Sequence, residues 1–191
     1  MNMSKARTLI LSLLIPLFAL TQDAFPDFGK PTAEDLKIKT CPFDPEADAV
    51  VLKHEAISEF SWSGKIFTQH HFKIKILKES AIGRANILIP FYSKDNIDTV
   101  EKIRGVVTNN NGGTQEIHLL ESRSIYTIRK NDNWSEVRFS MPNVQVGSII
   151  EYYYINIILG VNNIEDWYFQ KEIPVLVSKF ELNVGQRLEF T

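Results

Sequence analysis

The chain has 191 residues, with 21 basic and 23 acidic side chains and a formal net charge of -2. This length is typical of one domain, and 44% apolar with 23% charged residues is ordinary for a globular protein that needs no disulfide or metal to fold. The small negative charge argues against a nucleic-acid partner, or an acidic membrane, bound through bulk positive charge.

The N-terminus has the pattern of a secretory signal peptide. Lys5 and Arg7 form a short positive region, and the apolar run from Leu9 to Leu20 follows it. That run is too short to span a bilayer comfortably, which favours a signal peptide over residues 1–21 with cleavage before Gln22. A buried or interfacial helix is the alternative. We expect an exported chain, periplasmic or secreted, with no stable membrane span, because no later apolar run is long enough for one.

Residues 22–46 are rich in proline and aspartate, and we expect an irregular lead-in that runs over the surface. Within it, Thr32 precedes a run that favours a short helix over 33–36, with Thr32 as its N-cap. Cys41 is the single cysteine, so it cannot form an internal disulfide. We interpret it as a small buried side chain; the alternatives are a nucleophile or an intermolecular bond.

From residue 48 onward, β-branched and aromatic runs alternate with turn signals. In the run 65–77, Phe72 and its alternate neighbours lie on one face while Lys73 and Lys75 lie on the other, which predicts a half-buried strand. An Asn-Gly pair predicts a hairpin between two later runs. Roughly ten short strands with little helical periodicity predict an all-β fold, an antiparallel β-sandwich or distorted barrel over residues 47–191. The expected strands are 48–52, 57–62, 65–77, 86–91, 100–108, 114–119, 124–129, 136–140, 149–159, the run 167–170 with its continuation 173–178, and 178–184.

The stretch 147–180 carries the densest set of large apolar side chains, and we expect the domain to be organised around it. Trp167, Tyr168 and Phe169 follow one another in the chain. Each ring buries about 150–250 Å² when fully covered, which corresponds to roughly 4–6 kcal/mol before entropy is subtracted. None of the three is a nucleophile, a base or a usual metal ligand, so this stretch is interpreted as architecture.

Histidines and carboxylates do not form a recognisable reactive set. His70 and His71 are adjacent in an expected strand, so their side chains point to opposite faces and cannot grip one metal together. His54 and His118 have no ligand spacing, and we expect no metal site. Glu151 lies in an apolar run and must be paired or point outward; we expect it to point outward. The other carboxylates considered as solvent-facing strand residues are Glu59, Glu101, Glu116, Glu136 and Asp166.

Trp134 is the best candidate for a contact surface, because it lies in a polar turn rather than in an apolar run. Together with Tyr126 it could form a stacking surface for a glycan or a peptide. Packing over the end of the sandwich is the alternative. No glycine-rich phosphate loop or nucleophile motif is present in the sequence, so we expect no cofactor.

Four segments in a fixed order carry a family resemblance. They are residues 48–52; Ile103, Gly105, Val107, Gly112 and Gly113; residues 141–144 with 147–152; and Trp167, Phe169, Gln170, Ile173, Pro174, Val175 and Ser178. With them, residues 27–185 resemble the bacterial domain of unknown function that lies N-terminal to transglutaminase-like (papain-like cysteine) domains in exported proteins. The resemblance implies that Trp167, Phe169, Gln170, Pro174 and Ser178 define the fold, with Gln170 hydrogen-bonded to buried backbone.

The resemblance also bears on activity. In that family a catalytic domain with a Cys-His-Asp set follows, whereas this chain ends at Thr191 and Cys41 matches no catalytic position. We therefore expect no catalytic residues and no enzyme activity. The expected role is a non-catalytic domain that packs on, or assists substrate recognition by, a following catalytic domain, through an exposed apolar patch near the chain end. The alternative is a stand-alone exported binding module for polysaccharide or peptide.

Overall fold

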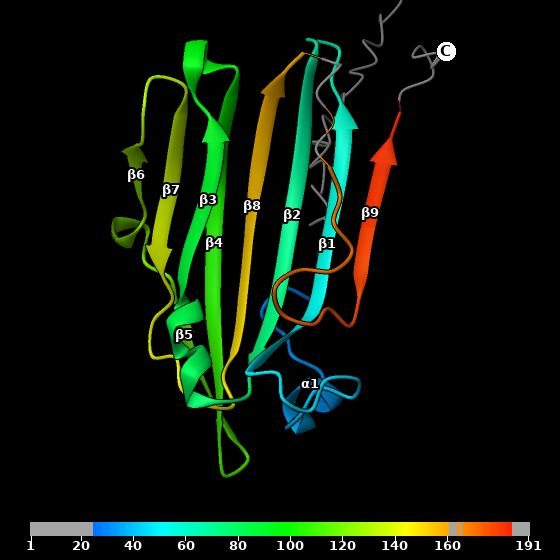
Figure 1. The fold of residues 1–191 in the computed structure, drawn as a ribbon, viewed down its shortest axis with the longest axis vertical. Coiled ribbons are helices and arrows are strands. Elements are labelled where there is room, and N and C mark those ends of the chain that lie inside the picture. The colour runs from blue at the N-terminus through cyan, green and yellow to red at the C-terminus, as the bar shows by residue number, and fades with distance from the viewer. Residues whose placement is uncertain (1–24, 161–163, 165, 185–191) are drawn as a thin grey trace, which may run out of the picture.

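Two β-sheets form the molecule (Figure 1). The computed structural model describes residues 25–160, 164 and 166–184, and the expected signal peptide lies outside these ranges. The large sheet has the strand order β5-β4-β8-β2-β1-β9, and the small sheet has the order β3-β7-β6. The elements are α1 (Ala33–Lys37), β1 (Ala49–Phe60), β2 (Lys65–Ile76), β3 (Asn86–Tyr92), β4 (Asp98–Asn111), β5 (Thr114–Leu119), β6 (Tyr126–Arg129), β7 (Trp134–Ser140), β8 (Ile149–Leu159) and β9 (Ser178–Asn183), with short 3-10 turns at Glu79–Ala85, Lys94–Asn96 and Ser122–Ser124.

Neighbouring strands are antiparallel except β1 and β9, which run parallel. The prediction of an all-β, two-layered fold is confirmed, and the sheets do not close into a barrel. The expected strands 48–52 and 57–62 are one continuous strand, β1. The sequence pattern does not predict a strand over the middle of β1, because Lys53 and Glu55 are charged. In the structure, Lys53 forms ion pairs with Glu55 and with Asp27 of the lead-in.

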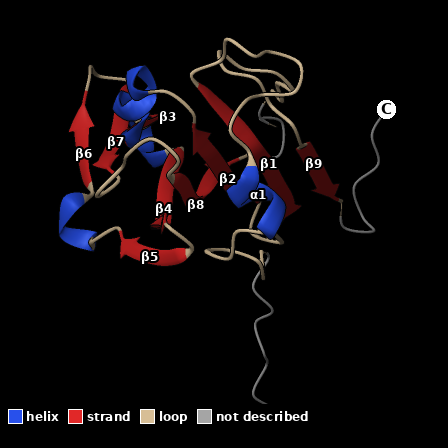
Figure 2. Cartoon of the chain, turned by 90° about the horizontal axis from the view of Figure 1, so that it is seen from below, coloured by secondary structure: helices blue, strands red, loops and turns tan. Residues whose placement is uncertain are grey.

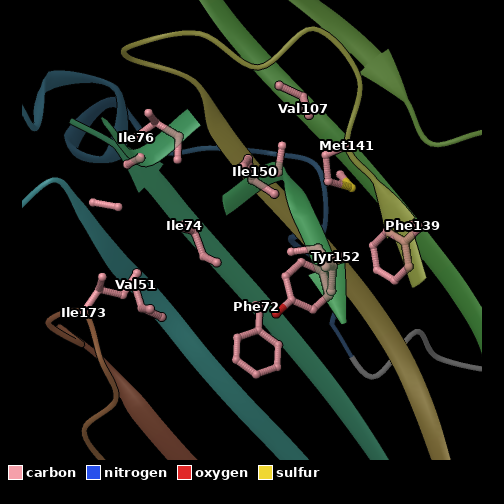
Figure 3. Close-up of a cluster of buried hydrophobic side chains, with 14 of the residues drawn as sticks. Val51, Phe72, Ile74, Ile76, Val107, Phe139, Met141, Ile150, Tyr152 and Ile173 are labelled. Atoms are coloured by element: carbon pink, nitrogen blue, oxygen red, sulfur yellow. The ribbon is translucent and has the colours of Figure 1, made fainter. Parts of the chain in front are cut away.

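The main core fills the space between the two sheets (Figure 3). β2 and β8 supply Phe72, Ile74, Ile150 and Tyr152, and the small sheet supplies Phe139. The rings of Phe72 and Tyr152 stack with centroids 4.8 Å apart. Aromatic and branched side chains alternate along these strands, so each strand buries one row against the opposing sheet.

Close packing at one point of this core requires a glycine. A Cβ added to Gly105 in β4 would lie 2.8 Å from the Met141 side chain and 3.1 Å from Leu120 Cβ. Such distances are below van der Waals contact, so a side chain at residue 105 would require the end of the Met141 side chain to move.

The lead-in covers the opposite face of the large sheet, which corrects the expectation of an exposed second face. Figure 2 shows α1 beside β1 and β2. Thr32 caps α1 as predicted, through reciprocal bonds with Asp35. Beneath it, Lys73 and Lys75 are each only 3% exposed. The alternating pattern identified the two faces correctly but carried no information about what covers the polar one.

The stretch 147–180 is only partly a centre of the fold. β8 has the predicted bounds. Residues 166–177, in contrast, form no strand and touch the sheet through an isolated bridge between Val51 and Val175. Tyr168 and Phe169 are 65% and 62% exposed, so two of the three consecutive aromatic residues do not supply the buried area that they could have supplied. The neighbouring place in the sheet is taken by β9, and this segment therefore crosses the sheet as a loop that buries Ile173 and Val175.

Candidate functional site

The segment 166–177 borders a hollow of about 430 Å³ on the face of the large sheet. Its floor comes from buried residues of β1, β2 and β8, and its rim comes from the segment itself and from Arg84. The lining residues are Val51, Phe72, Ile74, Arg84, Tyr152, Tyr168, Gln170, Lys171, Glu172 and Ile173. The hollow is thus mainly apolar and aromatic, with both signs of charge at its rim.

A row of stacked rings holds the segment against the sheet. Trp167 stacks on His54 of β1 at 4.1 Å, and His54 stacks on Phe72 of β2 at 3.9 Å. Trp167 Nε1–H also donates a hydrogen bond of 3.1 Å to Ser178 Oγ at the start of β9. Trp167 and Ser178 therefore contribute to the position of the segment.

Gln170 supplies a second attachment. Its Nε2–H donates to the Val175 carbonyl at 3.2 Å, and its Oε1 accepts from the Val175 N–H at 3.1 Å. The side-chain amide thereby satisfies both backbone groups of a buried residue, as a neighbouring strand would. Pro174 lies inside the turn that this clamp closes, and its carbonyl accepts from the N–H of Val51 at 2.8 Å.

His54 is not suited to move protons near neutral pH. It is buried, and neither ring nitrogen has a hydrogen-bond partner among the described residues. Burial, followed by the positive charge of Lys171 and the nearby histidines, lowers the pKa of His54 to about 3. The ring is therefore neutral at ordinary pH and acts as a flat aromatic side chain. Sequence reasoning missed this role, for which the only signal was the position of His54 in a strand.

Five of the exposed large apolar side chains lie in the C-terminal part of the described chain, whereas others, such as Trp62 at 89% exposed and Leu119 at 69%, lie elsewhere. Tyr168 and Phe169 project from the loop, and Val177 precedes β9. Ile164 and Val184 are exposed as well. An exposed apolar patch near the chain end was expected, and we call these five residues the C-terminal apolar segment.

Trp134 and Tyr126 lie on the outer face of the small sheet, at separate points. Trp134 is 46% exposed and packs edge-to-face on Tyr92 at 5.5 Å. Tyr126 is 55% exposed and pairs with Arg138, four residues along β7 from Trp134. Arg138 Nη2 and Glu136 form an ion pair of 2.7 Å between them. The two rings are accessible, but they do not form one stacked platform.

The other three histidines lie on strands and contact residues of neighbouring elements. His70 and His71 are on opposite faces of β2, as their adjacency requires: His70 stacks on Tyr154 and His71 faces the lead-in. His118 on β5 accepts a hydrogen bond of 3.0 Å at Nδ1 from Asn143. Within the described ranges, no three His, Cys, Asp or Glu side chains are placed to hold a metal ion.

Glu151 is buried and paired, so the expectation that it points outward is wrong. It is 1% exposed, and its Oε1 accepts a hydrogen bond of 2.6 Å from His71 Nε2. Lys73 Nζ lies 4.0 Å from the same oxygen. Both partners come from β2, the neighbouring strand, and the lead-in closes over them, so the buried carboxyl group is paired without facing water.

Cys41 is buried in an apolar cluster with Ala47, Val50, Leu52 and Ile149, which fits its interpretation as a small buried side chain. None of the helices in the described part of the chain has the length and apolarity that a membrane span needs.

Comparison with known proteins gives a family and a fold. The family described as Domain of Unknown Function with solved-structure structure (DUF3857) matches residues 63–191. Among solved structures, the chain is similar to a putative protease from Parabacteroides distasonis ATCC 8503, with a TM-score of 0.51 and 11% sequence identity. The match covers 60% of this chain and 24% of that one, so the chain spans about a quarter of that protein's length. A search of curated proteins found no significant match.

The similarity to the solved structure is a likeness of fold. The family match extends from the residues just before β2 to the end of the chain, and β1 completes the same sheet from outside the matched region. The match covers most of the chain, and on that basis the chain belongs to the DUF3857 family.

Proposed function

We propose that this domain is a non-catalytic docking domain of an exported protein. It packs on, or assists substrate recognition by, a transglutaminase-like catalytic domain that follows it in the same polypeptide. The observation that carries the proposal is the C-terminal apolar segment, in which Tyr168 and Phe169 are 65% and 62% exposed beside the last strand. The likeness of this fold to about a quarter of a longer solved protein supports a domain that works as part of a larger chain.

Energetics favour a partner for these two rings. A fully covered aromatic side chain buries about 150–250 Å², and about two thirds of Tyr168 and of Phe169 is still exposed. Covering that remainder would contribute about 2–4 kcal/mol for each ring at 25 cal/mol per Å². The attachments made by Trp167 and Gln170 hold the loop in place, so little conformational entropy remains to be lost on docking.

The proposal is tested in the longer protein. The coding region downstream of Thr191 is read first, and the domain it encodes is produced separately. We expect it to bind this chain in calorimetric titrations, and we expect Tyr168→Ser with Phe169→Ser to weaken binding at least tenfold. Trp134→Ser, which removes a ring that is 46% exposed from the small sheet, is the control. A stop codon at that position, or equal binding by the two variants, would overturn the proposal.

The second candidate is a binding module for polysaccharide or peptide. It is favoured by the exposure of Trp134 and Tyr126 on the outer face of the small sheet, next to the Glu136–Arg138 ion pair. Aromatic faces beside charged groups suit stacking and hydrogen bonding to a sugar or a peptide. For this function, glycan and peptide screens should show that Trp134→Ser loses binding of the ligand. The Tyr168 and Phe169 variants should bind the ligand as the wild type does.

A further inference from the structure

Residues 25–38, which we call the N-terminal arm, lie across a charged face of the large sheet. The floor beneath the arm contains Lys53, His71, Lys73 and Glu151, which come from three neighbouring strands. His71 and Glu151 are bonded to each other, and His71 Nδ1 lies 3.7 Å from Glu55 Oε2. A sheet face that a permanent cover buries is usually apolar, so this charged floor requires an explanation.

The arm complements the charge of the floor. Asp27 Oδ2 lies 2.9 Å from Lys53 Nζ, and Asp35 Oδ2 lies 3.5 Å from Lys73 Nζ. Lys75 Nζ donates to the Leu36 carbonyl at 3.4 Å. Burial acts to raise the pKa of Asp27, but the hydrogen bond and charge of Lys53 outweigh it and lower that pKa. Two of these three polar contacts therefore join an acidic group of the arm to a basic group of the sheet.

Two aromatic side chains of the arm anchor it on the same floor. Phe25 lies 4.8 Å from the His71 ring and 5.8 Å from the Tyr153 ring. Phe28 lies 5.8 Å from His71, and the Arg104 guanidinium lies over both Phe28 and Tyr153, at 5.7 and 4.9 Å from their centroids. The arm thus presents aromatic and acidic groups to rings and cations.

The arm contributes one core residue, Phe25, which is 7% exposed and clusters with Tyr153 and Ile155, and its remaining attachment resembles that of a bound peptide. Among the described residues, the hydrogen bonds that backbone groups of the arm form with other backbone groups stay within the arm, as from Phe28 N–H to the Phe25 carbonyl. α1 has no fully buried residue. Apolar side chains would hold a permanent cover at least as well as these ion pairs, whereas a charged floor stays hydrated when it is uncovered. The arm also lies outside the region that matches the family.

We propose that this face of the sheet is a binding site for an extended acidic peptide with aromatic anchors, and that the N-terminal arm occupies it as an intramolecular, autoinhibitory ligand. The partner is a segment of another protein that presents two aromatic residues around an aspartate, followed by a second acidic residue, as Phe25, Asp27, Phe28 and Asp35 do here. The inference is independent of docking through the C-terminal apolar segment, which lies at the other end of the described chain.

The test opens the site in the full chain. A specific protease site is inserted between Lys39 and Thr40, which are both exposed, and the folded protein is then cut. The cut keeps Cys41 and Ala47 with the sheet and frees the arm to dissociate, which withdraws Leu36 and Ile38 from their contact with the Cys41 cluster. Hydrogen exchange checks that amides in β2 and β8 remain protected after the cut.

The probes are fluorescein-labelled synthetic peptides. The first has the sequence of residues 25–38, and the second is an unrelated sequence that keeps the two phenylalanines and two aspartates at the same spacing. We expect both to bind the cut protein and not the uncut one. Asp27→Asn with Asp35→Asn in the first peptide should weaken binding about tenfold, since two charged pairs are lost. Glu34→Gln is the matched control, because Glu34 is exposed and should change binding less than twofold.

Several results would overturn the proposal. They are loss of protection in β2 and β8 on cutting, failure of either peptide to bind, or equal binding of the aspartate and asparagine peptides. A dimer formed by exchange of arms would assign the face to a second copy of the chain instead. A second measurement needs no insertion: in the uncut wild type, the amides of Leu36 and Ile38 should exchange much faster than those of β8. Equal exchange rates would make the arm an integral part of the core.

Discussion

His54 provides a quantitative prediction, because its ring is held neutral inside the domain. Burial lowers its pKa to about 3, whereas a histidine in the unfolded chain titrates at about 6.5. Between these values the unfolded state binds a proton that the folded state does not. The free energy of unfolding is therefore not reduced by His54 above pH 6.5, and it falls as the pH is lowered from 6.5 toward 3. The loss assigned to His54 is about 2 kcal/mol at pH 5.

The perturbation is His54→Phe, which keeps a flat ring between Trp167 and Phe72 and removes the titrating group. Urea unfolding is measured at pH 7.5 and at pH 5 for the wild type and the variant. We expect the wild type to lose about 2 kcal/mol more than the variant between these two conditions. His118→Gln, at a partly exposed histidine, is the control and should lose as much as the wild type. An equal loss in the wild type and in His54→Phe would refute the reasoning.

Three further substitutions test the packing, each by urea unfolding at neutral pH. Gly105→Ala should destabilise the fold by about 1–3 kcal/mol, because its Cβ would meet Met141 at 2.8 Å; unchanged stability would show that this core is loosely packed. Glu151→Ala should cost about 3–5 kcal/mol, because it leaves His71 buried without its partner, and a cost below 1 kcal/mol would contradict the buried pair. Trp167→Ala should cost about 1–3 kcal/mol, less than the roughly 3–5 kcal/mol of a fully buried tryptophan, and a larger loss would mean that its exposed side is covered in solution.

Strands with a clear period and turn signals at both ends were predictable from the sequence. β5 and β8 have the expected bounds, because each lies between turn residues and is rich in β-branched or aromatic side chains. The N-cap at Thr32 was predictable for the same local reason. These features depend on interactions within a few residues of one another.

Burial of charged side chains was not predictable. Lys73 and Glu151 read as solvent-facing because they alternate with apolar residues, and that pattern is correct for a sheet with one wet face. The cover comes from the lead-in, about 40 residues earlier than β2 in the chain, where a Pro- and Asp-rich sequence gives no sign of packing. The partner of Glu151, His71, is 80 residues away, and no local pattern connects the two.

An exposed apolar patch near the chain end was expected, but the sequence did not indicate that Tyr168 and Phe169 would be among its residues. The hydrophobicity of a side chain indicates that its burial is favourable, but it does not indicate which part of the chain buries it. Here Ile173 and Val175 take the positions that face the sheet, while Tyr168 and Phe169 face outward. Trp167, Gln170 and Ser178 lie in contacts that attach the segment, whereas Phe169 remains accessible apart from its edge-to-face contact with Trp167.

The most direct test of docking measures the exposure of these aromatics with and without the proposed catalytic domain. Hydroxyl-radical labelling of Tyr168 and Phe169 is compared between this chain alone and this chain joined to the proposed catalytic domain, with Trp134 as the internal reference. The account predicts strong labelling of both rings in this chain alone, protection of both in the joined protein, and equal labelling of Trp134 in the two. Equal labelling of Tyr168 and Phe169 in both proteins would contradict the docking of the proposed catalytic domain on this segment.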